Sequence, residues 1–462
     1  MSSLFSTDLE SLNTLYNRIT FSFVFLYGRA DMGKTSLIRD FCKEKRTLYF
    51  SAQDTVPQQQ LLAFWRETVQ TLKPRQIPPA FADWNQAFSY VSDYSFAHRL
   101  ILVLDEFHLL AQHSPEFMDA FQKAVSHTFP SGKVFLITST SSLTYAQEQM
   151  QDPVAAPFDV VTAKDCLGPV PFFTCQPLLS GYTPREQVLL YGVTGGLPSY
   201  IKKLRPMPTA RDNILALFFR SDSPFLTNPL NTLHRELREI STYNFLLQLM
   251  AEGTTKLADI AARAEIGTNK CAKYLNTLIS LGLIRKEFPA VGEIQKKVRY
   301  VFADHMLRFW YRFVYPNISG ILFGRGEEIY DQQAAPYLNE YLLPVFETVC
   351  AEYLERLAVT GQTPFVYRHT GSWWNGGTKK EPLIRIPLVA MDASHTVLGI
   401  CHYADAPADI SYLEQLQMPL EPFGETRRYY CIFSAAGFTD ELKARAAEAG
   451  NAWLIELEDM LA

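Results

Sequence analysis

The sequence lacks the features of a membrane-spanning or secreted protein. No apolar run reaches the roughly 18 residues that a transmembrane helix requires. The first residues, MSSLFSTDLE, have neither a cationic start nor an apolar segment, so they do not resemble a signal peptide. The seven cysteines are scattered without a C-x-x-C pair, and the nine histidines show no spacing typical of metal ligands. We therefore expect a cytoplasmic protein with reduced thiols and no membrane contact.

An excess of basic residues is also absent. The 462-residue chain carries a formal net charge of −5 at pH 7, and 47% of its residues are hydrophobic. Such a chain does not attract polyanions over its whole surface, so any contact with nucleic acid must use a local basic patch. The length favours about three domains, and the hydrophobic content is ample for buried cores.

A phosphate-binding motif lies near the N-terminus. The apolar run at 23–27 predicts a buried strand, and a helix is expected to begin near Gly33. Between them stands GRADMGKT, the Walker A pattern G-x-x-x-x-G-K-[ST] in the strand–loop–helix context that it requires. The glycines let backbone N–H groups approach phosphate oxygens. The alternative is a loop that matches the pattern by chance.

This motif predicts a site for ATP and Mg²⁺. We expect the Lys34 ammonium to lie near the β- and γ-phosphates and the Thr35 hydroxyl to ligate Mg²⁺. The predicted nucleotide-binding residues are Gly28, Arg29, Ala30, Asp31, Met32, Gly33, Lys34, Thr35 and Ser36.

A second motif follows in the stretch RLILVLDEFHLL at 99–110. Apolar residues precede Asp105 and Glu106, which places both acids at the C-terminal end of a predicted parallel strand, where open α/β sheets bind ligands. This is a Walker B pattern, in which Asp105 holds Mg²⁺ and Glu106 is the general base for the attacking water. The alternative is a strand end that carries two solvated acids.

A third polar group follows the predicted strand at 133–138. The residues Ser139, Thr140, Ser141 and Ser142 come directly after this strand. We favour Thr138 or Ser139, and assign Ser139, as the polar residue that contacts the γ-phosphate or the lytic water. An ordinary Ser/Thr turn or helix cap is the alternative.

The remaining N-terminal half predicts further alternating elements. The stretch TGGLP at 194–198 predicts a glycine turn between two helices, which is also compatible with a plain helix–helix connection. Helices are expected at 6–18, 58–72 and 81–92, a strand at 47–52, and an irregular crossing with a short strand at 152–177.

The middle of the chain predicts a winged helix-turn-helix. After an amphipathic helical pattern at 212–238, three short helices are followed by a two-stranded hairpin with a loop near Gly292. The third helix would be the recognition helix. The predicted elements are helices at 243–252, 256–264 and 268–281 and strands beginning at 283 and spanning 297–303.

Basic residues are concentrated in this region. The segment 285–299 contains five basic and two acidic side chains, and Lys270 and Lys273 lie on the expected recognition helix. We expect contact with double-stranded DNA through 268–299. The alternative is a purely structural or lid role, because the helix itself has no arginine.

The C-terminal third predicts a small α/β domain. The aromatic stretch HMLRFWYRFVY at 305–315 is expected to pack in a core, and 318–326 is expected to be a linker. The pattern then predicts a long helix at 337–357, strands at 383–390, 397–403 and 428–433, a helix at 440–449 and a last strand at 453–455.

Along nearly its full length, the chain resembles the archaeal and bacterial STAND-like, AAA+-related P-loop ATPase family. The matching stretches are LYGRADMGKTSLI, LVLDEFHLL, TGGLPSY and VRYVFADHMLRFWYRFVYPN. The resemblance implies a P-loop parallel sheet flanked by helices, then a winged helix and a restriction-endonuclease-like domain. The expected divisions are a 1–180 ATPase core, a 181–235 helical lid, a 236–316 winged helix and a 317–462 nuclease-like domain.

The sequence departs from that family in two regions. The family opens with F-x-G-R-x-x-E-L, which FSTDLESL matches only in part, and Ala30 replaces the second of two arginines in the phosphate loop. In the last domain, the resemblance assigns Glu347 and the pair Trp373-Trp374 to family positions. The E-I-D and E-x-K patterns, however, become Arg385-Ile386-Pro387 and Ile400-Cys401-His402.

The loss of these acids predicts the loss of nuclease chemistry, because metal-assisted hydrolysis needs several carboxylates. We expect the C-terminal domain to be a binding or scaffolding module that can accept a protein partner. For the whole chain we expect an ATPase that uses Mg-ATP as a conformational switch near DNA. The alternatives are a nucleotide-gated regulator with negligible turnover and an active nuclease. Arg29 and Arg185 are candidates for an arginine finger.

Overall fold

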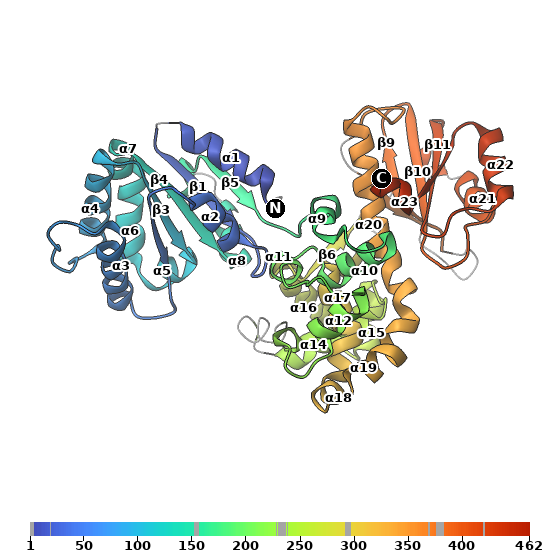
Figure 1. The fold of residues 1–462 in the computed structure, drawn as a ribbon, viewed down its shortest axis with the longest axis horizontal. Coiled ribbons are helices and arrows are strands. Elements are labelled where there is room, and N and C mark those ends of the chain that lie inside the picture. The colour runs from blue at the N-terminus through green and yellow to red at the C-terminus, as the bar shows by residue number, and fades with distance from the viewer. Residues whose placement is uncertain are drawn as a thin grey trace. The chain divides into compact units, whose positions relative to one another are not determined.

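The computed structural model describes residues 4–18, 20–151, 157–227, 229, 237, 239–291, 297–367, 370–375, 383–418 and 421–462. The chain forms two compact units, which Figure 1 colours from blue to red along the sequence. Unit 1 comprises Met1–Pro169 with the short segments Leu197–Ser199 and Ser280–Gly282. Unit 2 comprises Val170–Gly196, Tyr200–Ile279 and Leu283–Ala462. The predicted division into four domains stays a prediction.

Unit 1 is built on a five-stranded parallel sheet with the strand order β2-β3-β4-β1-β5. The predicted strand of the Walker A motif is β1, that of the Walker B motif is β3, and β4 lies between them. All six residues of β3 and all seven of β4 are buried, as expected of parallel strands that are covered on both faces. The strands are β1 (Ser22–Tyr27), β2 (Thr47–Ser51), β3 (Leu100–Asp105), β4 (Val134–Thr140) and β5 (Ala163–Cys166).

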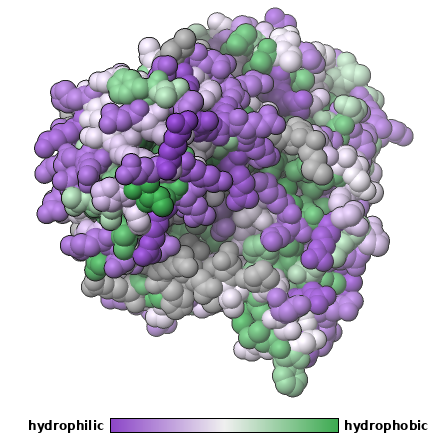
Figure 2. Space-filling model, turned by 60° about the vertical axis from the view of Figure 1, so that its left-hand side comes forward, coloured by the Kyte–Doolittle hydropathy of each residue, from purple (hydrophilic) through white to green (hydrophobic). Residues whose placement is uncertain are grey.

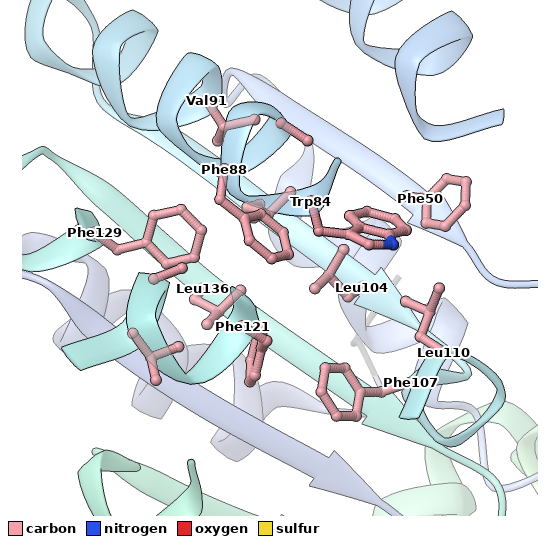
Figure 3. Packing of buried hydrophobic residues seen from close by; sticks show 14 of the residues in the cluster. Phe50, Trp84, Phe88, Val91, Leu104, Phe107, Leu110, Phe121, Phe129 and Leu136 are labelled. Carbon is pink, nitrogen blue, oxygen red and sulfur yellow. The ribbon is translucent and has the colours of Figure 1, made fainter. Parts of the chain in front are cut away.

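Helices cover both faces of this sheet (Figure 1). On one face, the rings of Tyr16, Phe41 and Phe135 join α1 and α2 to β4. On the other face, aromatic and aliphatic side chains of α4, α5 and α6 point toward the strand residues Leu104 and Leu136 (Figure 3). The helices are α1 (Ser6–Asn17), α2 (Lys34–Cys42), α3 (Pro57–Leu72), α4 (Trp84–Ala97), α5 (Phe107–His113), α6 (Pro115–Lys123), α7 (Phe129–Ser131) and α8 (Leu143–Gln151).

Unit 2 begins with a helical region. Three helices, α14, α15 and α16, and the antiparallel hairpin β6–β7 appear in the order that the sequence predicts. The elements are α9 (Phe172–Leu179), α10 (Pro184–Thr194), α12 (Ala210–Phe218), α14 (Ile240–Ala251), α15 (Leu257–Arg263), α16 (Thr268–Ser280), β6 (Ile284–Glu287), β7 (Arg299–Phe302), α17 (His305–Phe309), α18 (Ile318–Leu322) and α19 (Gly326–Ile329). The short helix α11 (Pro198–Ile201) follows the glycine turn.

The last part of unit 2 is a mixed sheet with the order β12-β11-β10-β9-β8. The pairs β8–β9 and β9–β10 are antiparallel, and β10–β11 and β11–β12 are parallel. Leucines of α21 and α22 pack against one face, and α20 contacts β9 and β10. The elements are α20 (Leu338–Val359), β8 (Gly371–Trp374), β9 (Arg385–Met391), β10 (His395–His402), α21 (Ser411–Gln417), β11 (Arg427–Ser434), α22 (Asp440–Ala449), β12 (Ala452–Glu456) and α23 (Leu457–Leu461).

Two expectations about local structure are wrong. The amphipathic pattern at 212–238 does not form one helix, because α12 ends at Phe218 and a short 3-10 turn begins at Pro224. Proline lacks the N–H that a continuing helix needs and forces the preceding residue into an extended conformation, as Ser223 has here. Most of 228–238 lies outside the described residues.

The expected linker at 318–326 is instead packed structure. It contains α18 and leads into α19, and Ile321 and Ile329 are buried. Ile321 is therefore part of the core of unit 2, whereas Leu322 and Phe323 are exposed.

Among the described residues, no helix is both long and apolar enough to span a bilayer. On the face drawn in Figure 2, hydrophilic residues predominate and hydrophobic ones are interspersed among them.

Candidate nucleotide-binding site

At two positions of the Walker A loop, the backbone has a conformation that only glycine adopts without strain. Gly28 has φ +150° and Gly33 has φ +83°. A Cβ atom at Gly28 would lie 2.4 Å from the carbonyl oxygen of Leu167, and one at Gly33 would lie 2.4 Å from the Phe5 ring. Because Gly33 directly precedes α2, the loop delivers its backbone to the N-terminus of that helix. Loops of this kind bind phosphate through their N–H groups.

The Lys34 side chain lies inside the loop. Its ammonium donates hydrogen bonds to the carbonyl oxygens of Gly28, at 2.6 Å, and Arg29, at 3.2 Å. Burial lowers the pKa of Lys34, and the nearby carboxylates of Glu106 and Asp105 oppose that shift. The ammonium is thus held at the place where the motif predicts phosphate oxygens, beside two acids that a bound metal ion would partly neutralise.

Asp105 is the centre of the polar cluster beside the loop. Its Oδ2 accepts hydrogen bonds from the Thr35 hydroxyl, at 3.3 Å, and from the Tyr49 hydroxyl, at 2.5 Å. Its Oδ1 accepts from the Ser139 hydroxyl and from the Glu106 N–H. The strand order explains this meeting, because β4 supplies Ser139 between the strands of the two motifs and β2 supplies Tyr49 from the other side of β3.

Thr35 and Asp105 fit a Mg²⁺ site. A hydroxyl and a carboxylate lie side by side, which is the pair of oxygen ligands that P-loop proteins offer to Mg²⁺ together with phosphates and water. No group of three or more His, Cys, Asp or Glu side chains that could hold a metal ion occurs in the described part of the chain. Thr35 and Asp105 would leave the remaining positions around Mg²⁺ to phosphate and water oxygens.

Glu106 lies at the junction of β3 and α5 in a left-handed conformation, with φ +53°. Non-glycine residues rarely adopt this conformation, and such backbone strain is found preferentially at functional sites. Its Oε2 accepts hydrogen bonds from the N–H of Ser141, at 2.9 Å, and from the hydroxyl of Ser141, at 2.7 Å. The Nδ1 atom of His108 lies 3.5 Å from the same oxygen.

The structure brings together Lys34, Thr35, Asp105, Glu106 and Ser139 from segments far apart in the sequence. It also adds residues that sequence reasoning missed: Tyr49, His108 and Ser141. Nothing in the sequence around Tyr49 marks it. His108 and Ser141 lie within the stretches DEFH and STSS, which were already singled out.

The other predicted loop residues lie around this cluster. Arg29 and Met32 are buried, and Ala30 and Thr35 are exposed. Thr138 is fully buried, and its hydroxyl has no hydrogen-bond partner among the described residues. Arg185 belongs to unit 2, where its guanidinium donates to Asp405 at 2.8 Å and lies over the Tyr403 ring.

The predicted DNA surface is only partly exposed. Lys270 and Lys273 lie on the exposed face of α16, and Arg285 and Lys286 are exposed on β6. Arg299 is less accessible, because its guanidinium lies 5.5 Å from the Trp374 ring centroid. Lys296 lies outside the described residues.

The hairpin is attached to the C-terminal sheet within unit 2. The indole N–H of Trp374 donates to the carbonyl oxygen of Lys297 at 3.0 Å. The N–H of Ala290 donates to the carbonyl oxygen of Ser372 at 2.8 Å, and Val291 packs against the core of the C-terminal sheet. The tryptophan that the resemblance assigns to a nuclease therefore holds the hairpin here.

At the nuclease-like position, Glu347 is paired with Arg385. Both guanidinium N–H₂ groups donate to the carboxylate, one to each oxygen, and the Nη2–Oε2 distance is 2.8 Å. Burial alone would lower the pKa of Arg385, but the Glu347 carboxylate outweighs it and raises that pKa. A guanidinium thus occupies the place where a metal would need carboxylate ligands, so the residues present do not fit a metal site.

Part of the chain matches a known protein family, and most of it is similar to a known protein. Residues 310–411 match DUF234, a family described as archaeal and bacterial proteins of unknown function. An uncharacterized protein of Methanocaldococcus jannaschii, MJECL04, is 27% identical over 374 residues, which are 80% of this chain and 81% of the relative.

Among solved structures, the chain is similar to the Walker-type ATPase PABY2304 of Pyrococcus abyssi. The TM-score is 0.51 at 14% identity, and the match covers 68% of this chain and 96% of that one. An ORC2 protein of Aeropyrum pernix, in complexes with ADPNP and ADP, has a TM-score of 0.45 at 16% identity, over 70% of this chain and 94% of the other. The first similarity shows that the fold is that of a P-loop ATPase, as predicted.

Proposed function

We propose that this chain, which has a P-loop ATPase fold and a DUF234 segment, binds and hydrolyses Mg-ATP and uses the nucleotide as a conformational switch. The observation that carries the proposal is the meeting of the two motifs, in which the Thr35 hydroxyl donates to Asp105 beside the buried Lys34 ammonium. A chance match of either motif does not explain why these three side chains converge.

Each side chain has a distinct role in this proposal. The loop N–H groups and Lys34 bind the β- and γ-phosphates, and Thr35 and Asp105 hold the metal. Bound Mg²⁺ would neutralise phosphate charge and orient the γ-phosphate. Glu106 accepts the proton of the attacking water. Ser139 donates a hydrogen bond to one Asp105 oxygen, and its contact with the γ-phosphate or the lytic water stays a prediction.

Nucleotide binding is tested by calorimetric titration of the whole protein with ATP and Mg²⁺. Lys34→Ala is expected to abolish binding, because it removes the ammonium that lies against the loop carbonyls and is proposed to bind the β- and γ-phosphates. Lys43→Ala is the matched control, since Lys43 follows the same helix but is 70% exposed and pairs with Asp40. ATP binding that survives in Lys34→Ala contradicts the proposed site.

A negligible-turnover regulator is distinguished from an ATPase by single-turnover hydrolysis. An enzyme converts one equivalent of bound ATP to ADP and phosphate within minutes, whereas a regulator retains ATP. The placement of Glu106 beside Asp105, with Oε2 fixed by Ser141, favours the enzyme.

DNA is the second proposed ligand, and α16 is the favoured contact. Lys270 and Lys273 are exposed on one helix, where a salt-dependent phosphate contact needs them. A double alanine variant of these lysines is expected to weaken binding to duplex DNA and to reduce its salt dependence. Variants of Lys296 and Lys297 test the hairpin separately. If the affinity for duplex DNA is unchanged in the variants of all four lysines, a lid or partner surface is favoured.

Nuclease activity is proposed to be lost. The Glu347–Arg385 pair supports this, since the one acid that matches the family is already neutralised by a guanidinium. Incubation of supercoiled plasmid with the protein and Mg²⁺ or Mn²⁺ is expected to leave it intact. Cleavage that persists in Lys34→Ala but disappears in Glu347→Ala contradicts this expectation.

A further inference from the structure

Three consecutive residues after the middle of β4 each bind a different residue of the Walker B segment. The Ser139 hydroxyl donates to Asp105, the Thr140 hydroxyl pairs with Nδ1 of His108 at 3.0 Å, and Ser141 donates to Glu106. The strand end therefore contacts both acids and the histidine in the first turn of α5. The third of these contacts has no assigned role.

Ser141 makes the most specific of these contacts. Its N–H and hydroxyl both donate to Oε2 of Glu106, at 2.9 and 2.7 Å. Two donors on one oxygen fix the rotation of the carboxylate, and they leave Oε1 as the oxygen that can accept a further proton. Hydrogen bonds to an ionised group are stronger than those between neutral groups. The two hydrogen bonds from Ser141 therefore outweigh the conformational entropy of the Glu106 side chain, which is 30% exposed.

The usual role of a serine at this place is already filled by its neighbour. The hydroxyl of Ser142 accepts a hydrogen bond from the N–H of Tyr145, at 3.2 Å, in the first turn of α8. Ser142 is therefore the residue that caps this helix. The hydroxyl of Ser141 is not needed for capping and is directed to Glu106 instead.

His108 makes the orientation of Glu106 more dependent on Ser141. Burial lowers the pKa of His108, against the opposing effect of the Glu106 carboxylate, and so disfavours a charged ring beside Glu106. Its Nδ1 already contacts Thr140 at 3.0 Å and lies farther from Oε2, at 3.5 Å. The ring thus limits the space around Oε2 without replacing the two donors of Ser141.

We propose that Ser141 is a positioning residue for ATP hydrolysis, which rests on the proposed function. Ser141 holds Oε2 so that Oε1 of Glu106 faces the attacking water. The water oxygen forms the new bond to the γ-phosphorus, its proton passes to Oε1, and the bond from the γ-phosphorus to the bridging oxygen breaks, with the electron pair leaving on ADP. If the Glu106 carboxylate rotates out of this orientation, proton transfer from the water slows. The loop that binds ATP is unaffected.

The test compares turnover and ATP binding in Ser141→Ala, Ser141→Thr and Ser142→Ala. In Ser141→Ala, we expect kcat to fall roughly tenfold to a hundredfold, the range for losing one hydrogen bond to a charged group, while the Kd for ATP stays the same. Ser141→Thr keeps the hydroxyl and is expected to restore turnover. Ser142→Ala, the matched control, is expected to keep the parental kcat.

A double variant separates positioning from general destabilisation. In Glu106→Gln, the additional change Ser141→Ala is expected to lower kcat no further, because the base that Ser141 orients is already gone. If Ser141→Ala turns over at or above the parental rate while Glu106→Gln does not, the positioning role is wrong. If Glu106→Gln itself turns over like the parent, the proposed base, and with it the proposed function of this residue, fails first.

Discussion

The Thr35 hydroxyl donates to Asp105 at 3.3 Å across 70 residues of sequence, and this contact joins the phosphate loop to the strand that carries both acids. Asp105 is only 4% exposed, yet both of its oxygens accept hydrogen bonds. A buried carboxylate is tolerated when hydrogen bonds stabilise its charge. Neighbouring side chains therefore hold the Asp105 carboxylate in a defined orientation.

Tyr49 is expected to tune metal binding. Tyr49→Phe removes the 2.5 Å hydrogen bond to Oδ2 of Asp105 but keeps the ring. Because residues that orient a metal ligand typically contribute about tenfold or more to metal affinity, we expect the Mg²⁺ concentration for half-maximal ATP hydrolysis to rise about tenfold. Tyr94→Phe is the control, since Tyr94 contacts Arg46 away from the site. Equal Mg²⁺ requirements in parent and Tyr49→Phe contradict this role.

The ion pair between Glu347 and Arg385 is expected to stabilise the C-terminal sheet only as a pair. Removing one partner from a largely buried pair costs about 3 kcal/mol, since the other charge is left uncompensated. Both single alanine variants should therefore lower the free energy of unfolding, and a double methionine variant should recover most of it. Denaturant unfolding followed by tryptophan fluorescence measures the free energy of unfolding of each variant. A change in the double variant equal to the sum of the changes in the two single variants would disprove the coupling.

Glu352 is expected to make the stability of unit 2 depend on pH. Burial raises the pKa of Glu352 from 4.5 to about 7, although its carboxylate accepts the N–H of Phe172 at 2.8 Å. The folded protein thus disfavours the ionised form. Its contribution to stability is greatest below pH 4.5 and is lost as the pH rises to 7, a difference of at most about 3 kcal/mol.

Glu352→Gln removes that titration while keeping an acceptor for Phe172. We expect the variant to melt at a higher temperature than the parent at pH 8.5 and to show a smaller advantage at pH 5. Glu414→Gln, at an exposed position on α21, is the control. An equal advantage of Glu352→Gln at both pH values contradicts the assignment.

The sequence was sufficient to predict the residues of the two motifs because each motif is contiguous. Gly28 to Thr35 and Asp105-Glu106 each follow an uninterrupted apolar strand, so their type and placement depend on local pattern alone. The positions of Tyr49 and Ser141 depend instead on which strands are neighbours. In the register of β2 with β3, Ser51 lies opposite Asp105. Tyr49 lies two residues before Ser51 on β2 and therefore on the same face of the sheet.

The errors have similarly local causes. Amphipathic periodicity continued through Pro224, but α12 ends at Phe218, and the missing N–H of Pro224 prevents one helix from continuing across that residue. At 318–326, the sequence predicted a linker, whereas α18 packs against α19 and Ile321 is buried. Patterns within one element were reliable, and contacts between elements were not visible in them.

The most direct test of the central claim is single-turnover hydrolysis of ATP by Glu106→Gln with Mg²⁺, with ATP binding measured on the same samples. We predict that this variant binds ATP as the parent does but hydrolyses it at least about a hundredfold more slowly, as expected for loss of a general base. Hydrolysis at the parental rate, or a parent protein that fails to bind ATP, would contradict the account.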